Sequence, residues 1–211
     1  MSDRPGPASG APRAEWRRWL LARRDQFVSD GEVAQATAQL GRHLAEVLNE
    51  LAPRCIGAYW PIRGEFNPWP MLDRAAGLRD IPRALPWSQR EPRRMVYRLW
   101  PAGGMLQPDA CGIPSADGPE VEPDVLIVPC VGFTPSGWRL GYGGGYFDRY
   151  LAEHRGALAV GVAWRCAEMP LEAFQPEPQD RPLAALVTDA GILLSPDGTA
   201  WSATGSPVEW L

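Results

Sequence analysis

The sequence contains no lysine, because all 21 of its basic residues are arginines. This absence excludes enzymes that depend on a Walker lysine, a lysine Schiff base or a lysine general base. Arginine remains a strong, bidentate partner for phosphates and carboxylates. We therefore expect anionic substrates to be bound through guanidinium groups and backbone amides.

Cysteine is scarce, and its pattern excludes a metal or disulfide framework. The four cysteines are far apart and form no C-x-x-C pair: Cys55, Cys111, Cys130 and Cys166. Zinc sites and disulfide-stabilised folds need closer, repeated spacings. The sequence predicts buried, reduced thiols.

Excess charge and long apolar runs are also missing. The formal net charge is −4 and the pI about 5.3, so the chain has no overall positive charge that would attract nucleic acid or anionic lipid. No run approaches the ~18 apolar residues of a membrane span. We predict neither a nucleic-acid nor a membrane partner, and any phosphate site must be local.

The chain of 211 residues has the length of one domain. Residues 1–12 are rich in Pro, Gly, Ser and Ala and lack the apolar core of a secretory signal. We interpret them as a flexible tail of a cytoplasmic protein. Residues 13–194 form the expected domain, and 195–211 remain an unassigned C-terminal tail.

Two helices are expected at the start of this domain. Residues 13–27 form a basic amphipathic helix, with its arginines Arg17, Arg18, Arg23 and Arg24 on the faces away from the apolar stripe. Ser29 and Glu32 can form a capping box for a second helix that runs to about Glu50.

Strands and helices alternate beyond this point. We expect strands at 55–60, 81–85, 95–100, 125–128, 158–164 and 184–188, a turn at 86–94, and helices at 71–76 and 146–153. This alternation predicts an α/β domain with a mainly parallel sheet. Ligands of such a sheet bind beyond the carboxyl ends of its strands.

The segment 139–149 carries the strongest functional signal. It places Gly141, Gly143, Gly144 and Gly145 directly ahead of a helix. Such glycines expose backbone N–H groups, and a helix start favours negative charge, so the segment predicts a phosphate site. It is neither a P-loop nor a dinucleotide fingerprint, because no G-K-[ST] follows and Tyr146 occupies the third glycine position. A tight turn that binds nothing is the alternative.

Charged residues flank these glycines. Arg139 and Arg149 bracket the segment, and we expect Arg139 on an exposed loop with little role in the core. Asp148 lies in the first helical turn, where it can either balance the helix dipole or hold a hard cation.

The segment resembles the signature of the 5-formyltetrahydrofolate cyclo-ligase family, which is close to R-L-G-Y-G-G-G-Y-Y-D-R, and only Phe147 departs from it. Arg13 and Arg17 match the family's K-x-x-x-R pattern, and 59–65 is similar to its Y-x-P-x-x-x-E segment. Further agreement includes 112–114, Gly-Ile-Pro. The resemblance extends over residues 13–194.

The resemblance implies a single three-layer α/β/α domain of the NagB/RpiA/CoA-transferase-like kind. It also implies that ATP drives cyclisation of 5-formyltetrahydrofolate, with or without a polyglutamate tail, to 5,10-methenyltetrahydrofolate, in a monomeric enzyme that uses Mg²⁺. Arg139 and Asp148 would be catalytic, and Asp148 with Asp180 would hold magnesium. The nucleotide would be bound by Arg13, Arg17, Arg139, Leu140, Gly141, Tyr142, Gly143, Gly144, Gly145, Tyr146 and Phe147.

The same resemblance implies a folate site. Glu65 would bind the pterin, and Trp60, Tyr142, Tyr146 and the glycines 143–145 would contact the folate, with Met95 and Trp138 as further walls. Without the family pattern, Glu65 and Asp180 read as loop carboxylates, Arg13 and Arg17 as a solvated helix face, and the aromatic residues as core.

Two departures support an alternative function. Arg13 stands where the family has lysine, and Thr134 stands where it often has aspartate. A catalytically weak relative that only binds a nucleotide or a folate is therefore the rival hypothesis. An RNA-binding derivative is disfavoured by the acidic overall charge.

Overall fold

The structure, a computed structural model, describes residues 5–31, 33–178, 180–181 and 183–194. An eight-stranded sheet has the order β12-β11-β10-β7-β1-β2-β3-β6. The five strands from β11 to β2 run parallel, whereas β12, β3 and β6 are antiparallel to their neighbours. The prediction of a mainly parallel sheet is confirmed. The strands of this sheet are β1 (Ile56–Gly57), β2 (Arg83–Gln89), β3 (Arg94–Leu99), β6 (Glu120–Val121), β7 (Val125–Pro129), β10 (Leu158–Val162), β11 (Ala185–Thr188) and β12 (Gly191–Leu194).

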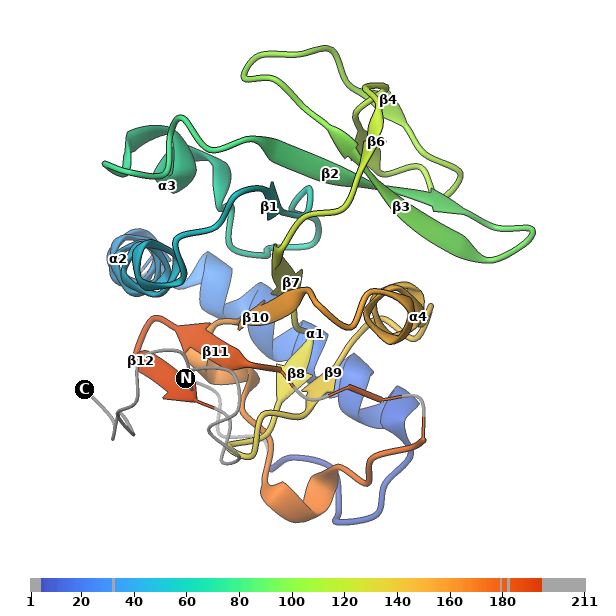
Figure 1. The fold of residues 1–211 in the computed structure, drawn as a ribbon. Coiled ribbons are helices and arrows are strands. Elements are labelled where there is room, and N and C mark those ends of the chain that lie inside the picture. The colour runs from blue at the N-terminus through green and yellow to red at the C-terminus, as the bar shows by residue number, and fades with distance from the viewer. Residues whose placement is uncertain (1–4, 32, 179, 182, 195–211) are drawn as a thin grey trace.

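Helices cover both faces of this sheet, as Figure 1 shows. The helices α2 and α3 pack on one face and α4 on the other, while α1 packs beside a small β8–β9 hairpin. The bounds are α1 Arg13–Ser29, α2 Val33–Leu51, α3 Trp69–Arg74, α4 Tyr146–Glu153, β8 Gly132–Phe133 and β9 Arg139–Leu140, with a further hairpin of β4 Gln107–Pro108 and β5 Pro114–Ser115 and 3-10 turns at Arg165–Ala167 and Leu171–Ala173.

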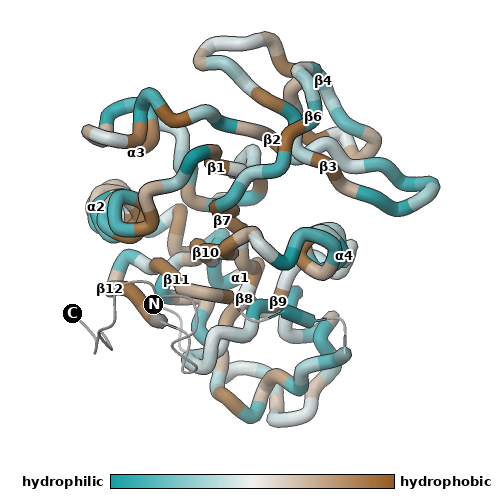
Figure 2. Tube along the Cα trace, viewed as in Figure 1, coloured by the Kyte–Doolittle hydropathy of each residue, from teal (hydrophilic) through white to brown (hydrophobic). Residues whose placement is uncertain are grey.

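The buried strand β7 explains why the layers hold together. Val125 and Ile127 pack toward α2, whereas Leu126 and Val128 pack toward α4. Successive side chains of a strand point to opposite faces, so a continuous apolar run fills two cores at once. In Figure 2 the central strands are coloured as hydrophobic, whereas the helices carry both hydrophobic and hydrophilic residues.

Two local expectations need correction. The expected turn at 86–94 is shorter, because β2 continues to Gln89. Trp100 donates to the Arg83 carbonyl, and because hydrogen-bonded pairs alternate along an antiparallel ladder, Pro86 and Tyr97 form a non-hydrogen-bonded pair. On its other side β1 pairs only with Arg83 and Ala84, so the missing N–H of Pro86 removes no bond of the sheet. Arg24 lies not on a solvated face of α1 but in the interior, with 2% exposure.

The remaining local expectations concern termini and thiols. Ser29 ends α1, where its hydroxyl donates to the carbonyl of Asp25 at 2.8 Å, whereas Glu32, its expected capping partner, lies outside the described residues.

The cysteines are free thiols, but only Cys130 is fully buried. In the part of the chain that the structure describes, we find no helix whose length and apolar character would suit a bilayer crossing.

Candidate active site

A cavity of about 820 Å³ opens beyond the carboxyl ends of β1 and β7. Tyr59 and Trp60, just after β1, and Pro129, the last residue of β7, form part of its wall. This is the expected ligand position for a parallel sheet. All but one of the site residues predicted from the sequence line the cavity: Arg13, Arg17, Trp60, Glu65, Met95, Arg139, Leu140, Gly141, Tyr142, Gly143, Gly144, Gly145, Tyr146, Phe147, Asp148 and Asp180.

The glycine bend at 141–145 lies between the guanidinium groups of Arg17 and Arg149. The Arg17 Nε donates to the Gly141 carbonyl at 2.7 Å, and Arg149 Nη2 donates to the Gly144 carbonyl at 2.6 Å. Gly143 and Gly145 have φ of 93° and 63°, and Gly145 is the N-cap of α4. A Cβ at Gly143 would lie 3.3 Å from the Arg17 guanidinium carbon. Glycine is therefore needed both for the backbone turn and for the approach of the arginine.

We call the part of the cavity around Arg13, Arg17, Arg139, Asp148 and Asp180 the arginine end. Arg139 Nη2 donates to Asp148 Oδ1 at 2.5 Å, and Arg13 Nη2 donates to Asp180 Oδ2 at 2.5 Å. Arg139 belongs to β9 and its side chain is 5% exposed. The expectation of an exposed loop arginine was wrong, because the chain pairs with β8 before it turns.

Mutual neutralisation governs the charges of the arginine end. The hydrogen bond with Asp180 raises the pKa of Arg13. Burial alone would raise the pKa of Asp180, but the hydrogen bonds from Arg13 and from the Glu177 amide bring it below its ordinary value. Burial, reinforced by the charge of Arg13, lowers the pKa of Arg17. The positive charges of Arg13 and Arg17 repel each other, and a bound anion would reduce this repulsion.

We call the part around Tyr59, Glu65 and Tyr142 the glutamate end. The hydroxyl of Tyr142 donates to Glu65 Oε1 at 2.9 Å, and the Ile62 amide donates to Oε2 at 2.9 Å. The Glu65 side chain is 4% exposed, so the reading as a solvated loop glutamate was wrong. Burial raises the pKa of Glu65 above its ordinary value and raises that of Tyr142 to about 12.

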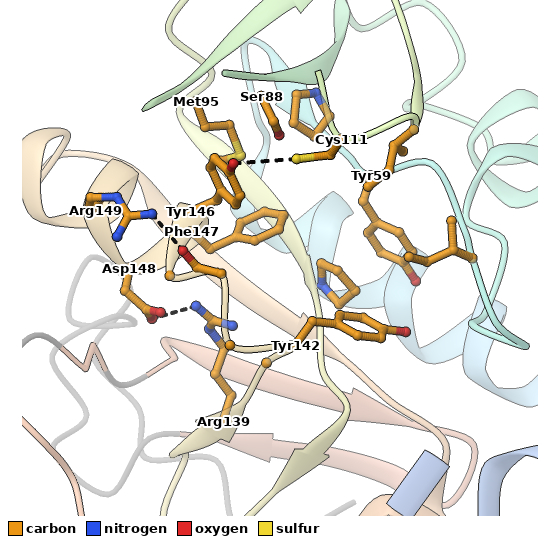
Figure 3. Close-up of a pocket in the computed structure, with 18 of the residues that line it drawn as sticks. Tyr59, Ser88, Met95, Cys111, Arg139, Tyr142, Tyr146, Phe147, Asp148 and Arg149 are labelled. Atoms are coloured by element: carbon orange, nitrogen blue, oxygen red, sulfur yellow. Dashed lines mark hydrogen bonds and ion pairs between the residues drawn. The ribbon is translucent and has the colours of Figure 1, made fainter. Parts of the chain in front are cut away.

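We call the remaining part, around Ser88, Met95 and Cys111, the hairpin end, because it lies at the β2–β3 hairpin. Figure 3 shows these three residues on the side of the pocket opposite Arg139. The Cys111 thiol donates to the Tyr146 hydroxyl at 3.4 Å, which itself donates to the Gln89 carbonyl at 3.1 Å. Tyr146 therefore ties the glycine bend to the hairpin.

The hairpin end contains residues to which sequence reasoning gave no role. The carboxylate of Asp109 accepts hydrogen bonds from the amides of Ser88, Cys111 and Ile113 at 2.8 to 3.0 Å and shapes this wall. The only signal was the motif at 112–114, which gave no hint of Asp109 itself.

Two residues from the sequence argument lie outside the cavity. Trp138 stacks on Phe174, with ring centroids 6.2 Å apart, and is not among the lining residues, so its prediction as a folate wall was wrong. Thr134 is fully buried and its hydroxyl bonds to that of Ser136 at 2.9 Å. Its departure from the family pattern therefore leaves the cavity wall unchanged.

The fold and the cavity together define an α/β protein with a glycine bend and several arginines at the carboxyl edge of its sheet, a site suited to an anionic ligand. A model of the 5-formyltetrahydrofolate cyclo-ligase family matches residues 10–189. The chain belongs to this family.

Curated and solved relatives agree with this assignment. The 5-formyltetrahydrofolate cyclo-ligase of Escherichia coli (strain K12) is 42% identical over 71 residues, which span 33% of this chain but only 38% of that protein. The enzyme of the same name from Mycolicibacterium smegmatis is 27% identical over 152 residues, which span 66% of this chain and 75% of that protein.

Two solved structures share the fold. A 5,10-methenyltetrahydrofolate synthetase from Aquifex aeolicus superposes with a TM-score of 0.66 and 26% identity over 93% of this chain and 96% of that one. One from Mycoplasma pneumoniae gives a TM-score of 0.64 at 20% identity over 84% and 98%. The predicted fold class is confirmed.

Proposed function

We propose that this protein converts 5-formyltetrahydrofolate into 5,10-methenyltetrahydrofolate and hydrolyses ATP to ADP and phosphate in the process. One observation carries the proposal: the glycine bend with its arginines and the buried Glu65 face the same cavity. A phosphate donor and a folate can therefore meet there. The proposal includes a monomeric, cytoplasmic enzyme that also accepts polyglutamylated substrate.

The arginine end is the proposed triphosphate site. Arg13, Arg17 and Arg139 would neutralise the phosphates, and the amides of 141–147 would donate to their oxygens. Arg13 and Arg139 are now paired with Asp180 and Asp148. A bound triphosphate would compete with these carboxylates for the guanidinium groups.

Magnesium fits this exchange of partners. The described residues contain no cluster of three or more His, Cys, Asp or Glu that could hold a metal by themselves. Magnesium instead uses one or two carboxylates and completes its shell with phosphates and water. Asp148 and Asp180, released from their arginines, would supply these carboxylates. The ion would neutralise phosphate charge.

The glutamate end is the proposed pterin site. A carboxylate with two oxygens can accept several hydrogen bonds, so Glu65 retains capacity for the N–H groups at the edge of a pterin. Tyr142 and Trp60 offer flat apolar surfaces beside it, and Tyr146 and Met95 continue that surface toward the hairpin end. The arrangement suits a flat, extended substrate.

The chemistry requires two displacements. The formyl oxygen bonds to the γ-phosphorus while the bond from that phosphorus to the ADP oxygen breaks. The N10 lone pair then bonds to the formyl carbon, phosphate departs with the former formyl oxygen, and N10 loses its proton to water. Positioning and charge neutralisation carry most of the catalysis in such transfers. The arginines would stabilise the departing phosphates, and Glu65 would fix the pterin.

A direct assay tests the proposal. Purified protein is mixed with 5-formyltetrahydrofolate, ATP and magnesium, and the near-ultraviolet absorbance of the methenyl product is followed together with ADP. Stoichiometric formation of both supports the proposal. Nucleotide or folate binding without product would instead identify the catalytically weak binding module.

A further inference from the structure

Arg24 is a buried arginine that the proposed chemistry does not yet use. It lies in α1, 2% exposed, and contacts three segments that are distant in sequence. Its Nη2 donates to the Cys130 carbonyl at 2.6 Å, just beyond β7. Its Nη1 donates to the Tyr142 hydroxyl at 3.1 Å and lies 3.7 Å from Glu65 Oε1.

These contacts place a positive charge directly behind the glutamate end. Glu65 is the acidic partner in the one ion pair that the structure shows for Arg24 among its described residues. Among the described residues, the other titratable groups whose pKa responds to the charge of Glu65 or Arg24 are Tyr59, Tyr142, Cys130 and Cys166. Phenols and thiols are neutral near pH 7 when burial raises their pKa. The buried charge of Arg24 is therefore balanced by Glu65.

We propose that Arg24 is a positioning residue that keeps Glu65 ionised and orients Tyr142 toward it, so that Glu65 presents a fixed carboxylate to the pterin. This inference rests on the proposed folate site. Arg24 lines no part of the cavity and acts only through Glu65 and Tyr142.

The balance of forces on Glu65 explains why such a residue is needed. Burial raises the pKa of Glu65, and the Ile62 amide, the Arg24 charge and the Tyr142 hydroxyl oppose that rise. A buried carboxyl without a nearby cation becomes protonated at higher pH. A protonated Glu65 would lose acceptor capacity. Removing Arg24 should therefore weaken pterin binding as the pH falls.

A purely structural role is the competing explanation, because the bond to the Cys130 carbonyl also ties α1 to the sheet. Two variants separate the roles. Arg24→Gln removes the charge but can still donate to this carbonyl, whereas Arg24→Met removes both. Arg18→Met is the matched control, since Arg18 lies on the exposed face of the same helix.

The first measurement does not depend on turnover. The Glu65 carboxyl is followed by NMR with ¹³C-labelled glutamate, and its resonance is assigned with Glu65→Gln. We expect Arg24→Gln and Arg24→Met to raise its titration midpoint by about one unit or more, and Arg18→Met to leave it in place. An unchanged midpoint in a folded variant overturns the proposal. If Arg24→Met does not fold, Arg24→Gln decides.

The second measurement uses steady-state kinetics. Arg24→Gln should raise KM for 5-formyltetrahydrofolate about tenfold or more, leave KM for ATP within about twofold, and move the acid limb of kcat/KM to higher pH. Equal changes in both KM values would indicate a structural role and overturn the proposal. A wild-type protein without turnover refutes the proposed function instead, while the NMR titration still decides the role of Arg24.

Discussion

The arginine end and the glutamate end of the cavity are built in opposite ways. The arginine end combines the segment 139–149 with Arg13 and Arg17 of α1 and with Asp180, and its charges pair within the cavity wall. The glutamate end joins α1, the segment after β1 and the glycine bend, and its Glu65 side chain is 4% exposed. A ligand can displace partners at the first end, whereas the second is already fixed before a ligand arrives.

This difference matches the two proposed ligands. Phosphates carry several charges and can replace carboxylates as partners of arginine. A pterin offers directional N–H groups, which reward a preorganised acceptor. The two ends should therefore respond differently to mutation: the arginine end should control phosphoryl transfer, and the glutamate end should control folate affinity.

The largest effect is expected at the arginine end. Arg139→Ala should lower kcat about 10³-fold, because it removes a cation from the transferring phosphate. It should also destabilise the fold by about 2 kcal/mol, since a buried hydrogen bond to the charged Asp148 is lost. Single-turnover absorbance and thermal unfolding measure the two effects. A fully active variant would remove Arg139 from the phosphate site.

The next largest effect concerns Glu65. Glu65→Gln should lower kcat/KM for 5-formyltetrahydrofolate about 10- to 100-fold while ATP affinity is retained, because an ionised acceptor is lost. Burial raises the pKa of Glu65, so wild-type kcat/KM should fall as the pH drops through that pKa. The variant should lack this acid limb. Loss of ATP affinity instead would show that the two ends are not separate.

A smaller effect is expected within the glycine bend. Gly143→Ala should weaken ATP binding about tenfold, because φ of 93° and the nearby Arg17 guanidinium leave poor room for a Cβ. Gly156→Ala is the control, since a Cβ there meets nothing within 4 Å. Isothermal titration with ATP gives the affinities. Equal affinities for the two variants would contradict the phosphate role of the bend.

The smallest effect is expected at the hairpin end. Arg93 lines the cavity, whereas its exposed neighbour Arg94 does not. We expect Arg93 to pair with the carboxylates of a polyglutamate tail. Arg93→Ser should therefore raise KM for a polyglutamylated substrate about twofold to fivefold more than for the monoglutamate, a small effect because an exposed ion pair contributes little. Arg94→Ser should change neither value. The same response from both variants would exclude a tail site at Arg93.

Sequence patterns predicted what short stretches of chain determine. A continuous apolar run located β7, and helical patterns located α2 and α4, because each is a strongly apolar or amphipathic element. The arginine end was predictable for the same reason, since its core is one segment with a family signature. The family resemblance then added Glu65, which local context alone would have left in solvent.

Contacts between distant segments escaped prediction. Arg24 and Arg139 were expected in solvent, because charged residues are seldom buried. Arg139 is buried because β9 pairs with β8 and its guanidinium bonds to Asp148, whereas the partners of Arg24 lie far along the chain. Arg24 is paired by Tyr142 and Cys130, more than one hundred residues away. Asp109 was missed because its partners are backbone amides, which leave no side-chain signal in the sequence.

The central claim is that the amides of the glycine bend and the surrounding guanidinium groups bind the phosphates of a nucleotide beside a folate. A crystal structure with a non-hydrolysable ATP analogue, magnesium and 5-formyltetrahydrofolate tests it most directly. We predict phosphate oxygens within hydrogen-bonding distance of the 141–147 amides and of Arg17, with the pterin against Glu65. A nucleotide bound elsewhere, with the bend empty, would contradict the account.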